Sequence, residues 1–154
     1  MSQSIYGHVE YKEFRYSYFA RVHLEADYTL LALLGGGPRE EPTPCFASRD
    51  VPADMNPLTA HAYYLVVSDN KPHCDRYISR QEAENWVASG VSKWISPTGI
   101  TDPDFHNPSW LLTEELEQIY SVYLSHNPAP LPCVEATLAA MRLLPDARFV
   151  YWFW

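Results

Sequence analysis

The sequence predicts an α+β fold with a single domain over residues 1–154, because strand-like and helix-like segments are mixed along a chain of single-domain length. Residues 5–24 and 148–154 are rich in aromatic and β-branched side chains, which favour strands. Four segments between them carry the start and stop signals of helices. A chain of this length can bury about 68–70% of its unfolded surface in one core. We therefore expect an antiparallel sheet that three or four helices cover.

The sheet is expected to combine three parts of the sequence. Residues 5–12 alternate loosely and residues 14–24 are rich in Tyr, Phe and Val, so together they predict an opening hairpin. Residues 61–68, with the sequence HAYYLVVS, predict a further strand. The aromatic and branched run at residues 148–154 is too short to span a membrane and indicates a buried central strand.

The first two predicted helices each have a side-chain cap. Asp27 can accept hydrogen bonds from the first amides of a short helix over residues 28–34, which Gly35 would end in a left-handed conformation. The glycines that follow resemble a phosphate-binding loop only superficially, since no GK[ST] motif is present. Ser79 begins a capping box, with glutamate three residues later, and predicts a helix over residues 80–89.

Two more helices are predicted in the second half of the sequence. Thr113 is expected to cap a helix that extends to about residue 125, with acidic residues in its first turn and an apolar stripe on one face. Residues 134–144 form the other helix, which Pro145 stops. The proline-rich segment 38–57 lacks apolar periodicity and is expected to be a long loop.

Composition and charge exclude several classes of function. The formal net charge of −8, from 19 acidic and 11 basic residues, would repel a nucleic acid backbone, so double-stranded DNA is not an expected ligand. No apolar run approaches the ~20 residues that span a bilayer, and the first residues do not resemble a signal peptide. Cys45, Cys74 and Cys133 form no CxxC pair and fit reduced thiols. We expect a soluble intracellular protein.

The segment DPDFHNPSWL at residues 102–111 is the strongest candidate for a functional site, because rigid turns and reactive side chains lead directly into a helix start. Asp104 and His106 would point the same way in an extended chain and could orient a general base or ligate a metal. A histidine in such a turn more often bonds loop carbonyls, and no metal-binding motif completes a set of ligands. Ser109 lacks the GxSxG elbow of a nucleophile. We therefore predict neither a catalytic residue nor a metal site.

The same segment could instead hold an anion beside an aromatic ring. Trp110 precedes the predicted helix start, whose amides attract anions, and Arg49 and Arg76 could donate to a phosphate. The alternative is that Trp110 packs the loop onto the helix as a hydrophobic staple. The predicted ligand-binding residues are Arg49, Arg76, Asp104, His106, Ser109 and Trp110.

Three separated blocks of the sequence resemble a family of small uncharacterised proteins of tailed phages. Residues 27–35 and 49–57 (DYTLLALLG and RDVPADMNP) are similar to that family's LFALLAG…PRGLPEDVSPE block. Residues 78–86 and 102–111 (ISRQEAENW and DPDFHNPSWL) resemble its VSREEAEEWV…DPDWHSPSWLT block, and residues 149–153 (FVYWF) resemble its closing RIVFWFDN strand. The resemblance implies phage origin and action in the host bacterial cytoplasm, and it supplies no reaction.

Phage origin and these residue types suggest three functions. The first is an accessory protein of counter-defence that binds and sequesters a small nucleotide-derived immune signal, without turnover and without a cofactor. The second is a protein-binding inhibitor of a host factor, or an assembly factor, whose acidic surface docks a basic partner. The third is a phosphodiesterase-type enzyme that degrades the signal with His106 and Asp104. A ligand held between copies of the chain would make the protein a homo-oligomer.

Overall fold

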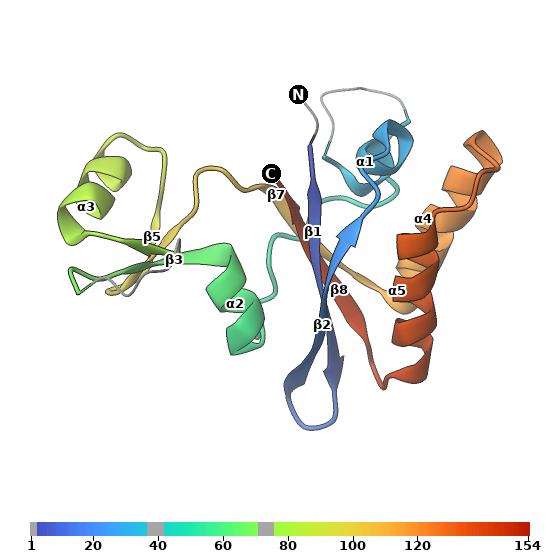
Figure 1. Cartoon of the computed structure of the whole chain (residues 1–154), viewed down its shortest axis with the longest axis horizontal. Coiled ribbons are helices and arrows are strands. Elements are labelled where there is room, and N and C mark those ends of the chain that lie inside the picture. Colours follow the sequence, from blue (N-terminus) through green and yellow to red (C-terminus); the bar gives the residue numbers. More distant parts are fainter. Residues whose placement is uncertain (1–2, 37–41, 71–75) are drawn as a thin grey trace. The chain divides into compact units, whose positions relative to one another are not determined.

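The computed structural model describes residues 3–36, 42–70 and 76–154 (Figure 1). Five helices and eight strands are mixed along these residues, which confirms the α+β class. The expectation of one domain over the whole chain stays a prediction, as does the expectation of a homo-oligomer.

The chain separates into two compact units. Unit 1 combines Met1–Asn56 with His106–Trp154, and unit 2 is the intervening segment Pro57–Phe105. Unit 1 is therefore discontinuous in sequence, whereas unit 2 is continuous.

Unit 1 is built on a four-stranded antiparallel sheet with the strand order β2, β1, β8, β7. In that order its strands are Tyr16–Leu24, Ile5–Lys12, Arg148–Phe153 and His106–Leu112 (Figure 1). The opening hairpin and the buried central strand near the C-terminal end are confirmed. Strand β7 corrects the expectation of a turn-rich segment before the third helix, because residues 106–111 of that segment belong to a strand that pairs with β8.

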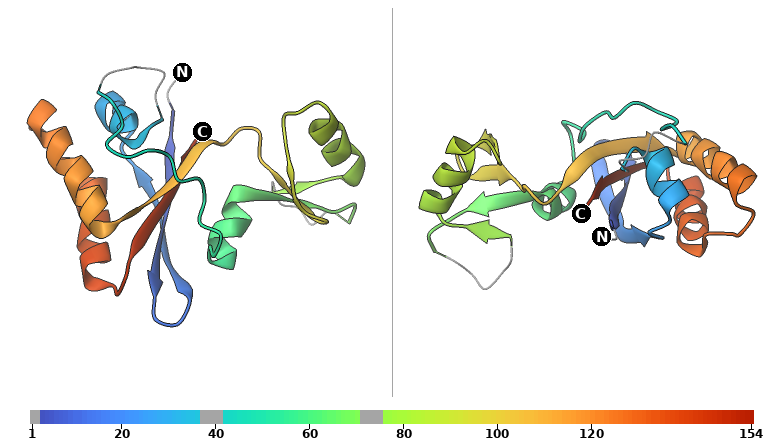
Figure 2. Two further views of the ribbon diagram at one scale, coloured as in Figure 1. Left: turned by 180° about the vertical axis from the view of Figure 1, so that it is seen from behind. Right: turned by 90° about the horizontal axis from the view of Figure 1, so that it is seen from above.

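Three helices cover one face of this sheet: α1 (Tyr28–Leu34), α4 (Thr113–His126) and α5 (Pro132–Leu143) (Figure 2). Each helix contributes side chains to one hydrophobic core that it shares with the strands. Side chains alternate between the two faces of a strand, so this core takes every second residue of the central strands. From β1 and β8 the core contains Ile5, Val9, Phe149, Tyr151 and Phe153.

The helix ends of unit 1 follow their predicted caps, with one exception. The Asp27 carboxylate accepts from two amides in the first turn of α1 at 2.9 and 3.1 Å, and Gly35 ends that helix with a φ of 89°. Thr113 is the first residue of α4 rather than its cap, because β7 continues through Leu112. The Glu115 carboxylate takes the capping role and accepts from the Leu112 amide at 2.9 Å.

Unit 2 has a smaller sheet with the strand order β4, β3, β6, β5, in which only the β3–β4 pair is parallel. Ser79 caps the helix α3 as predicted, because its hydroxyl accepts from the Glu82 amide at 3.2 Å. The elements are α2 (Pro57–Tyr63), β3 (Tyr64–Val67), β4 (Tyr77–Ile78), α3 (Arg80–Ala88), β5 (Trp94–Ser96) and β6 (Gly99–Thr101). The core of this unit contains Leu65, Val67, Ile78, Ala83 and Ile100.

The predicted strand at residues 61–68 is wrong in two respects. Helix α2 includes its first residues, so only Tyr64–Val67 is extended, and this strand belongs to the sheet of unit 2 rather than to that of the hairpin. Pro57 accounts for the helix, because proline suits the first helical position, where an amide hydrogen has no partner. Alternation in a sequence identifies a strand but does not identify the neighbour with which it pairs.

Two further properties can be stated for the described residues. None of their helices is both long and apolar enough to cross a bilayer. Cys45 and Cys133 are free thiols, and Cys74 lies outside the described residues.

Candidate functional site

The six residues predicted to bind a ligand are divided between the two units. Unit 1 contains Arg49, His106, Ser109 and Trp110, and unit 2 contains Arg76 and Asp104. Neither unit by itself brings both arginines to one place.

In unit 1, a carboxylate holds the Arg49 guanidinium. Both terminal nitrogens of Arg49 donate to Glu115, one of them at 2.6 Å, and one also donates to the Trp110 carbonyl at 3.3 Å. The guanidinium lies 4.8 Å from the centre of the Trp110 ring, in a cation–π contact. A phosphate would have to displace the carboxylate from this bidentate pair before Arg49 could bind it.

Ser109 and His106 lie on the edge strand β7 and differ in exposure. The buried Ser109 hydroxyl accepts from the Arg49 amide at 3.0 Å, and the Ser48 hydroxyl donates to the Pro108 carbonyl at 2.9 Å. These two bonds fasten the preceding loop to the sheet. His106 is exposed at the start of the strand. Ser109 is thus a structural group, and His106 is open to solvent.

The Arg49–Glu115 pair predicts a pH-dependent part of the stability of unit 1. The hydrogen bond from Arg49 holds the pKa of Glu115 below its usual value, against the opposing effect of burial. The folded state therefore binds this proton less readily than the unfolded state does. The stabilisation is present above the usual glutamate pKa and is lost as the pH falls through the lowered pKa of the folded state.

We expect the difference in unfolding free energy between the wild-type protein and Glu115→Gln to shrink between about pH 5.5 and about pH 3. Urea unfolding of both proteins at the two pH values measures this difference. Other titrating groups are common to both proteins and cancel in the comparison. A difference that stays constant would contradict the role of the ionised Glu115.

In unit 2, Asp102 holds both residues, because it pairs with Arg76 and closes the turn that contains Asp104. The Arg76 guanidinium donates to the Asp102 carboxylate at 2.5 Å and to the Tyr64 carbonyl at 3.1 Å. It also lies 5.0 Å from the centre of the Phe105 ring. The other Asp102 oxygen accepts from the Asp104 amide at 2.9 Å. The second arginine that was expected to meet a phosphate is therefore also paired with a carboxylate.

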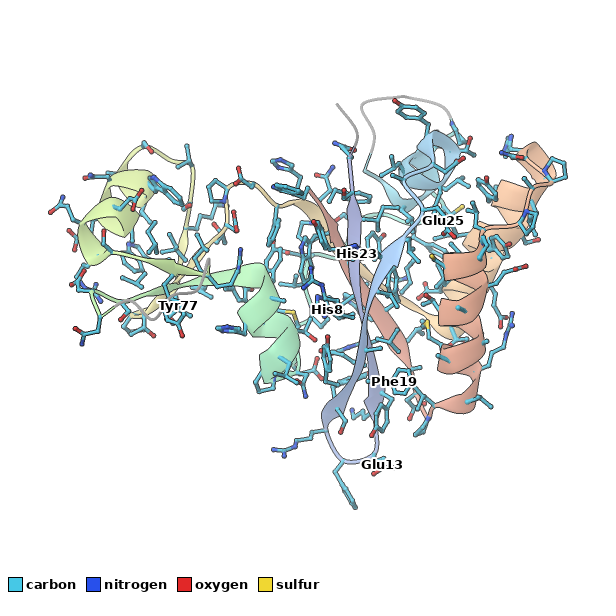
Figure 3. All side chains as sticks on the ribbon, in the orientation of Figure 1. His8, Glu13, Phe19, His23, Glu25 and Tyr77 are labelled. Carbon is cyan, nitrogen blue, oxygen red and sulfur yellow. The ribbon has the colours of Figure 1, made fainter. Side chains whose placement is uncertain are left out.

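One group of side chains escaped the sequence-based predictions and lies on the face of the unit 1 sheet opposite the three helices. Alternation places Tyr6 and His8 of β1 on this face, and the strand register pairs them with His23 and Arg21 of β2. Figure 3 labels His8 and His23 on these neighbouring strands. Trp154 follows β8 and contacts Tyr6. We use the term sheet-face patch for Tyr6, Arg21, His23 and Trp154.

Within the sheet-face patch, Tyr6 contacts each of the other three side chains. The Tyr6 ring meets the His23 ring edge-on with centroids 4.6 Å apart, and its centroid lies 6.2 Å from that of Trp154, which is 56% exposed. The Arg21 guanidinium lies 5.5 Å over the Tyr6 ring and 3.4 Å from Nε2 of His23. Among the described residues, Arg21 forms no ion pair with a carboxylate, in contrast to both predicted arginines.

Two buried rings lie on the same face beside the patch. His8 stacks on Trp152 with centroids 5.0 Å apart, and its Nδ1 lies 3.1 Å from the Tyr18 hydroxyl. Burial, reinforced by Arg21 and His23, lowers the pKa of His8 to about 4. The imidazole is therefore neutral at pH 7, so it contributes a ring to this face and no positive charge.

The sequence contains only part of the signal for the sheet-face patch. The patterns Tyr6-x-His8 and Arg21-x-His23 each place two side chains on one face of a strand, once both strands are recognised. The register that puts the two patterns side by side depends on pairing across the hairpin, and the position of Trp154 depends on pairing with a distant strand.

The sheet-face patch can hold an anion next to a flat ring. Arginine stays protonated and presents its donors in a planar fork, while exposed aromatic rings offer stacking surfaces. In the part of the chain that the structure describes, no group of three or more His, Cys, Asp or Glu side chains could hold a metal ion. No protein-family model, curated protein or solved structure matches this chain.

Proposed function

We propose that this protein is a phage-encoded accessory protein of counter-defence that binds and sequesters a small nucleotide-derived immune signal, without turnover, in the host bacterial cytoplasm. The observation that supports this proposal most strongly is the sheet-face patch. There Arg21, which has no carboxylate partner among the described residues, lies beside the Tyr6 and His23 rings and near Trp154. The proposed ligand site therefore moves from the six sequence-predicted residues to this face of unit 1.

A nucleotide carries a flat base and a phosphate close together, and the patch offers a partner for each. Stacking of a base on an aromatic side chain is worth about 1–3 kcal/mol by alanine substitution. A guanidinium binds a phosphate through two parallel hydrogen bonds. The backbone of Trp154 is held in line with β1 by two hydrogen bonds to Ser4, at 2.9 and 3.1 Å. Because the strands already order these groups, little conformational freedom is lost on binding.

The charge of the protein favours a small ligand over a long nucleic acid. A net charge of −8 repels an extended phosphate backbone, whose binding requires many cations. A single local guanidinium can still attract one small anion, because the two charges meet at short range. The proposal therefore concerns a compact nucleotide.

The first test is retention of an unmodified ligand. Purified protein is incubated with cyclic oligonucleotides and ADP-ribose derivatives, free ligand is removed, and the protein is heat-denatured so that the released compounds can be identified. Recovery of an intact compound supports sequestration. A converted compound would identify an enzyme instead, and retention of nothing in the panel would contradict the proposed ligand class.

Replacing Trp154 by alanine should weaken ligand retention about 5- to 150-fold, because one stacking surface of about 1–3 kcal/mol is removed. Phe14→Ala is the matched control, since Phe14 is 98% exposed at the turn between β1 and β2 and lies outside the patch. Equilibrium dialysis of both variants measures the effect. Equal losses in the two variants would argue against stacking on Trp154.

A second candidate function, inhibition of a host factor by protein binding, is favoured by the hairpin turn itself. Phe14 is 98% exposed between Glu13 and Arg15, with Lys12 one residue before Glu13. Aromatic side chains and arginine are enriched in protein interfaces relative to the rest of the surface. If this function holds, Phe14→Ala abolishes the support of phage growth by the protein supplied in trans, whereas Trp154→Ala retains it. The sequestration proposal expects the opposite order.

A further inference from the structure

We infer that the sheet-face patch recognises one nucleoside monophosphate unit, with the phosphate on Arg21 and the base stacked on the exposed ring of Trp154. This inference rests on the proposed function and defines its ligand class. The unit occurs in a free mononucleotide, where the phosphate is a monoester, and in each residue of a cyclic oligonucleotide, where every base has one phosphate of its own as a diester.

Few cations on this face of the sheet are available to a phosphate. Arg148 is on the same face, but its guanidinium lies 2.7 Å from a Glu10 oxygen in a buried ion pair. Lys12 and Arg15 lie at the hairpin turn, and Arg15 is six residues, or about 20 Å, along the strand from Arg21. Within the described part of the chain, Arg21 is therefore the arginine that this patch can offer to a phosphate.

Two histidines, His8 and His23, lie next to Arg21. His8 faces Arg21 across the strands and is neutral at pH 7, because burial lowers its pKa to about 4. It therefore adds no charge for a second phosphate. His23 is two residues further along β2, and its Nε2 lies 3.4 Å from the Arg21 guanidinium. The His23 side chain is exposed.

Tyr6 lies between the cation and the exposed ring of the patch. Tyr6 contacts both Arg21, at 5.5 Å from its ring centre, and Trp154, at 6.2 Å between centroids. One ring therefore separates the cation from the exposed ring of Trp154. A ribose has the same position in a nucleotide, between base and phosphate, so it would lie next to Tyr6.

Additional phosphates on the ligand should not strengthen its binding to the patch. Each one adds negative charge next to a chain with a net charge of −8, and the patch provides no further arginine for it. The first phosphate should therefore strengthen binding, and the second and third should not.

Isothermal titration at low salt with adenosine, AMP, ADP and ATP, and in parallel with the guanosine series, tests this inference. A hydrogen-bonded contact to a charged group is worth about 1.5–3 kcal/mol, so we expect the monophosphate to bind about 10- to 150-fold more tightly than its nucleoside. The diphosphate and triphosphate should bind no more tightly than the monophosphate.

Arg21→Met keeps the length and apolar stem of the side chain and removes its charge. This variant should bind the monophosphate no better than the nucleoside, while its affinity for the nucleoside is unchanged. Arg15→Met is the matched control, because it removes an arginine of the same hairpin that lies far from the patch, and it should preserve the preference for the monophosphate. Thermal unfolding of each variant checks that the fold is retained.

The outcomes separate this inference from the proposed function. If nucleotides bind but Arg21→Met leaves the preference for the monophosphate intact, or if ATP binds more than about tenfold more tightly than AMP, the inference is wrong and sequestration of a nucleotide still stands. If neither purine series binds to the wild-type protein, and the panel of immune signals is not retained, the proposed function fails as well.

Discussion

Replacing Arg148 by methionine should lower the free energy of unfolding by about 3–5 kcal/mol, because the Glu10 carboxylate is then buried without its cation. Arg148 is 3% exposed and Glu10 is 0% exposed, and the guanidinium donates to the carboxylate at 2.8 Å. Arg148 also donates to the Asp54 carboxylate at 2.8 Å and lies 3.2 Å over the Tyr16 ring. The loss therefore affects both strands of the hairpin, the central strand β8 and the loop that contains Asp54.

Arg142→Met is the matched control for this prediction. Arg142 donates to Glu117 at 2.7 Å, but the two side chains are 55% and 39% exposed, and such surface pairs contribute about 0–1 kcal/mol. Urea unfolding of the two variants compares a buried pair with an exposed one in the same unit. An Arg148→Met loss no larger than that of the control would contradict the argument. Combining Arg148→Met with Glu10→Gln should recover part of the loss, because the unpaired charge is removed.

Gly7→Ala should be the second most damaging substitution, with a loss at the upper end of the ~1–3 kcal/mol that overpacking a core typically costs. Gly7 lies in the middle of β1, and a β-carbon added there would overlap with the ring of Phe149 on β8. Phe149 is fully buried, so its ring has no open space into which it could move. The added methyl group must therefore displace the core or separate the two central strands, and either change loses close packing.

Phe149→Leu provides the test of this steric explanation. The smaller side chain should destabilise the wild-type protein, because it leaves a cavity, but it should create room for the methyl group of Gly7→Ala. The double variant is then more stable than the sum of the two single losses predicts, as measured by urea unfolding. Additive losses would mean that the ring of Phe149 is not the obstacle.

The elements that could be predicted from the sequence are those whose signals are local. Asp27 and Gly35 bracket α1, and Ser79 starts α3, because a cap acts on amides within one turn of the same segment. Strand β8 could be predicted because five of its six residues are aromatic or branched apolar residues, which favour a buried strand. The opening hairpin could be predicted because two strand-like segments are adjacent in the sequence.

The features that could not be predicted depend on partners that are distant in sequence. Arg49 was recognised as a planar cation, but its partner Glu115 is 66 residues away, and this carboxylate accepts from the donors that were expected to bind phosphate. Strand β3 was recognised as extended, yet only pairing with Gly99–Thr101 assigns it to a second sheet. The sheet-face patch was missed for the same reason, because its residues come together through strand register.

The interruption of unit 1 by unit 2 sets the order in which the two units can form during synthesis on the ribosome. All of unit 2 comes from one continuous segment, so its sheet can close as soon as that segment has emerged. Strand β1 can pair with β2 soon after both are synthesised. The ion partner of Glu10, Arg148, is 138 residues further along the chain and is synthesised much later. Until β8 arrives, the nascent hairpin presents an open sheet edge and an apolar face. Unit 1 is therefore most open to chaperones, and to mispairing with other chains, through its hairpin while β8 has not yet been made.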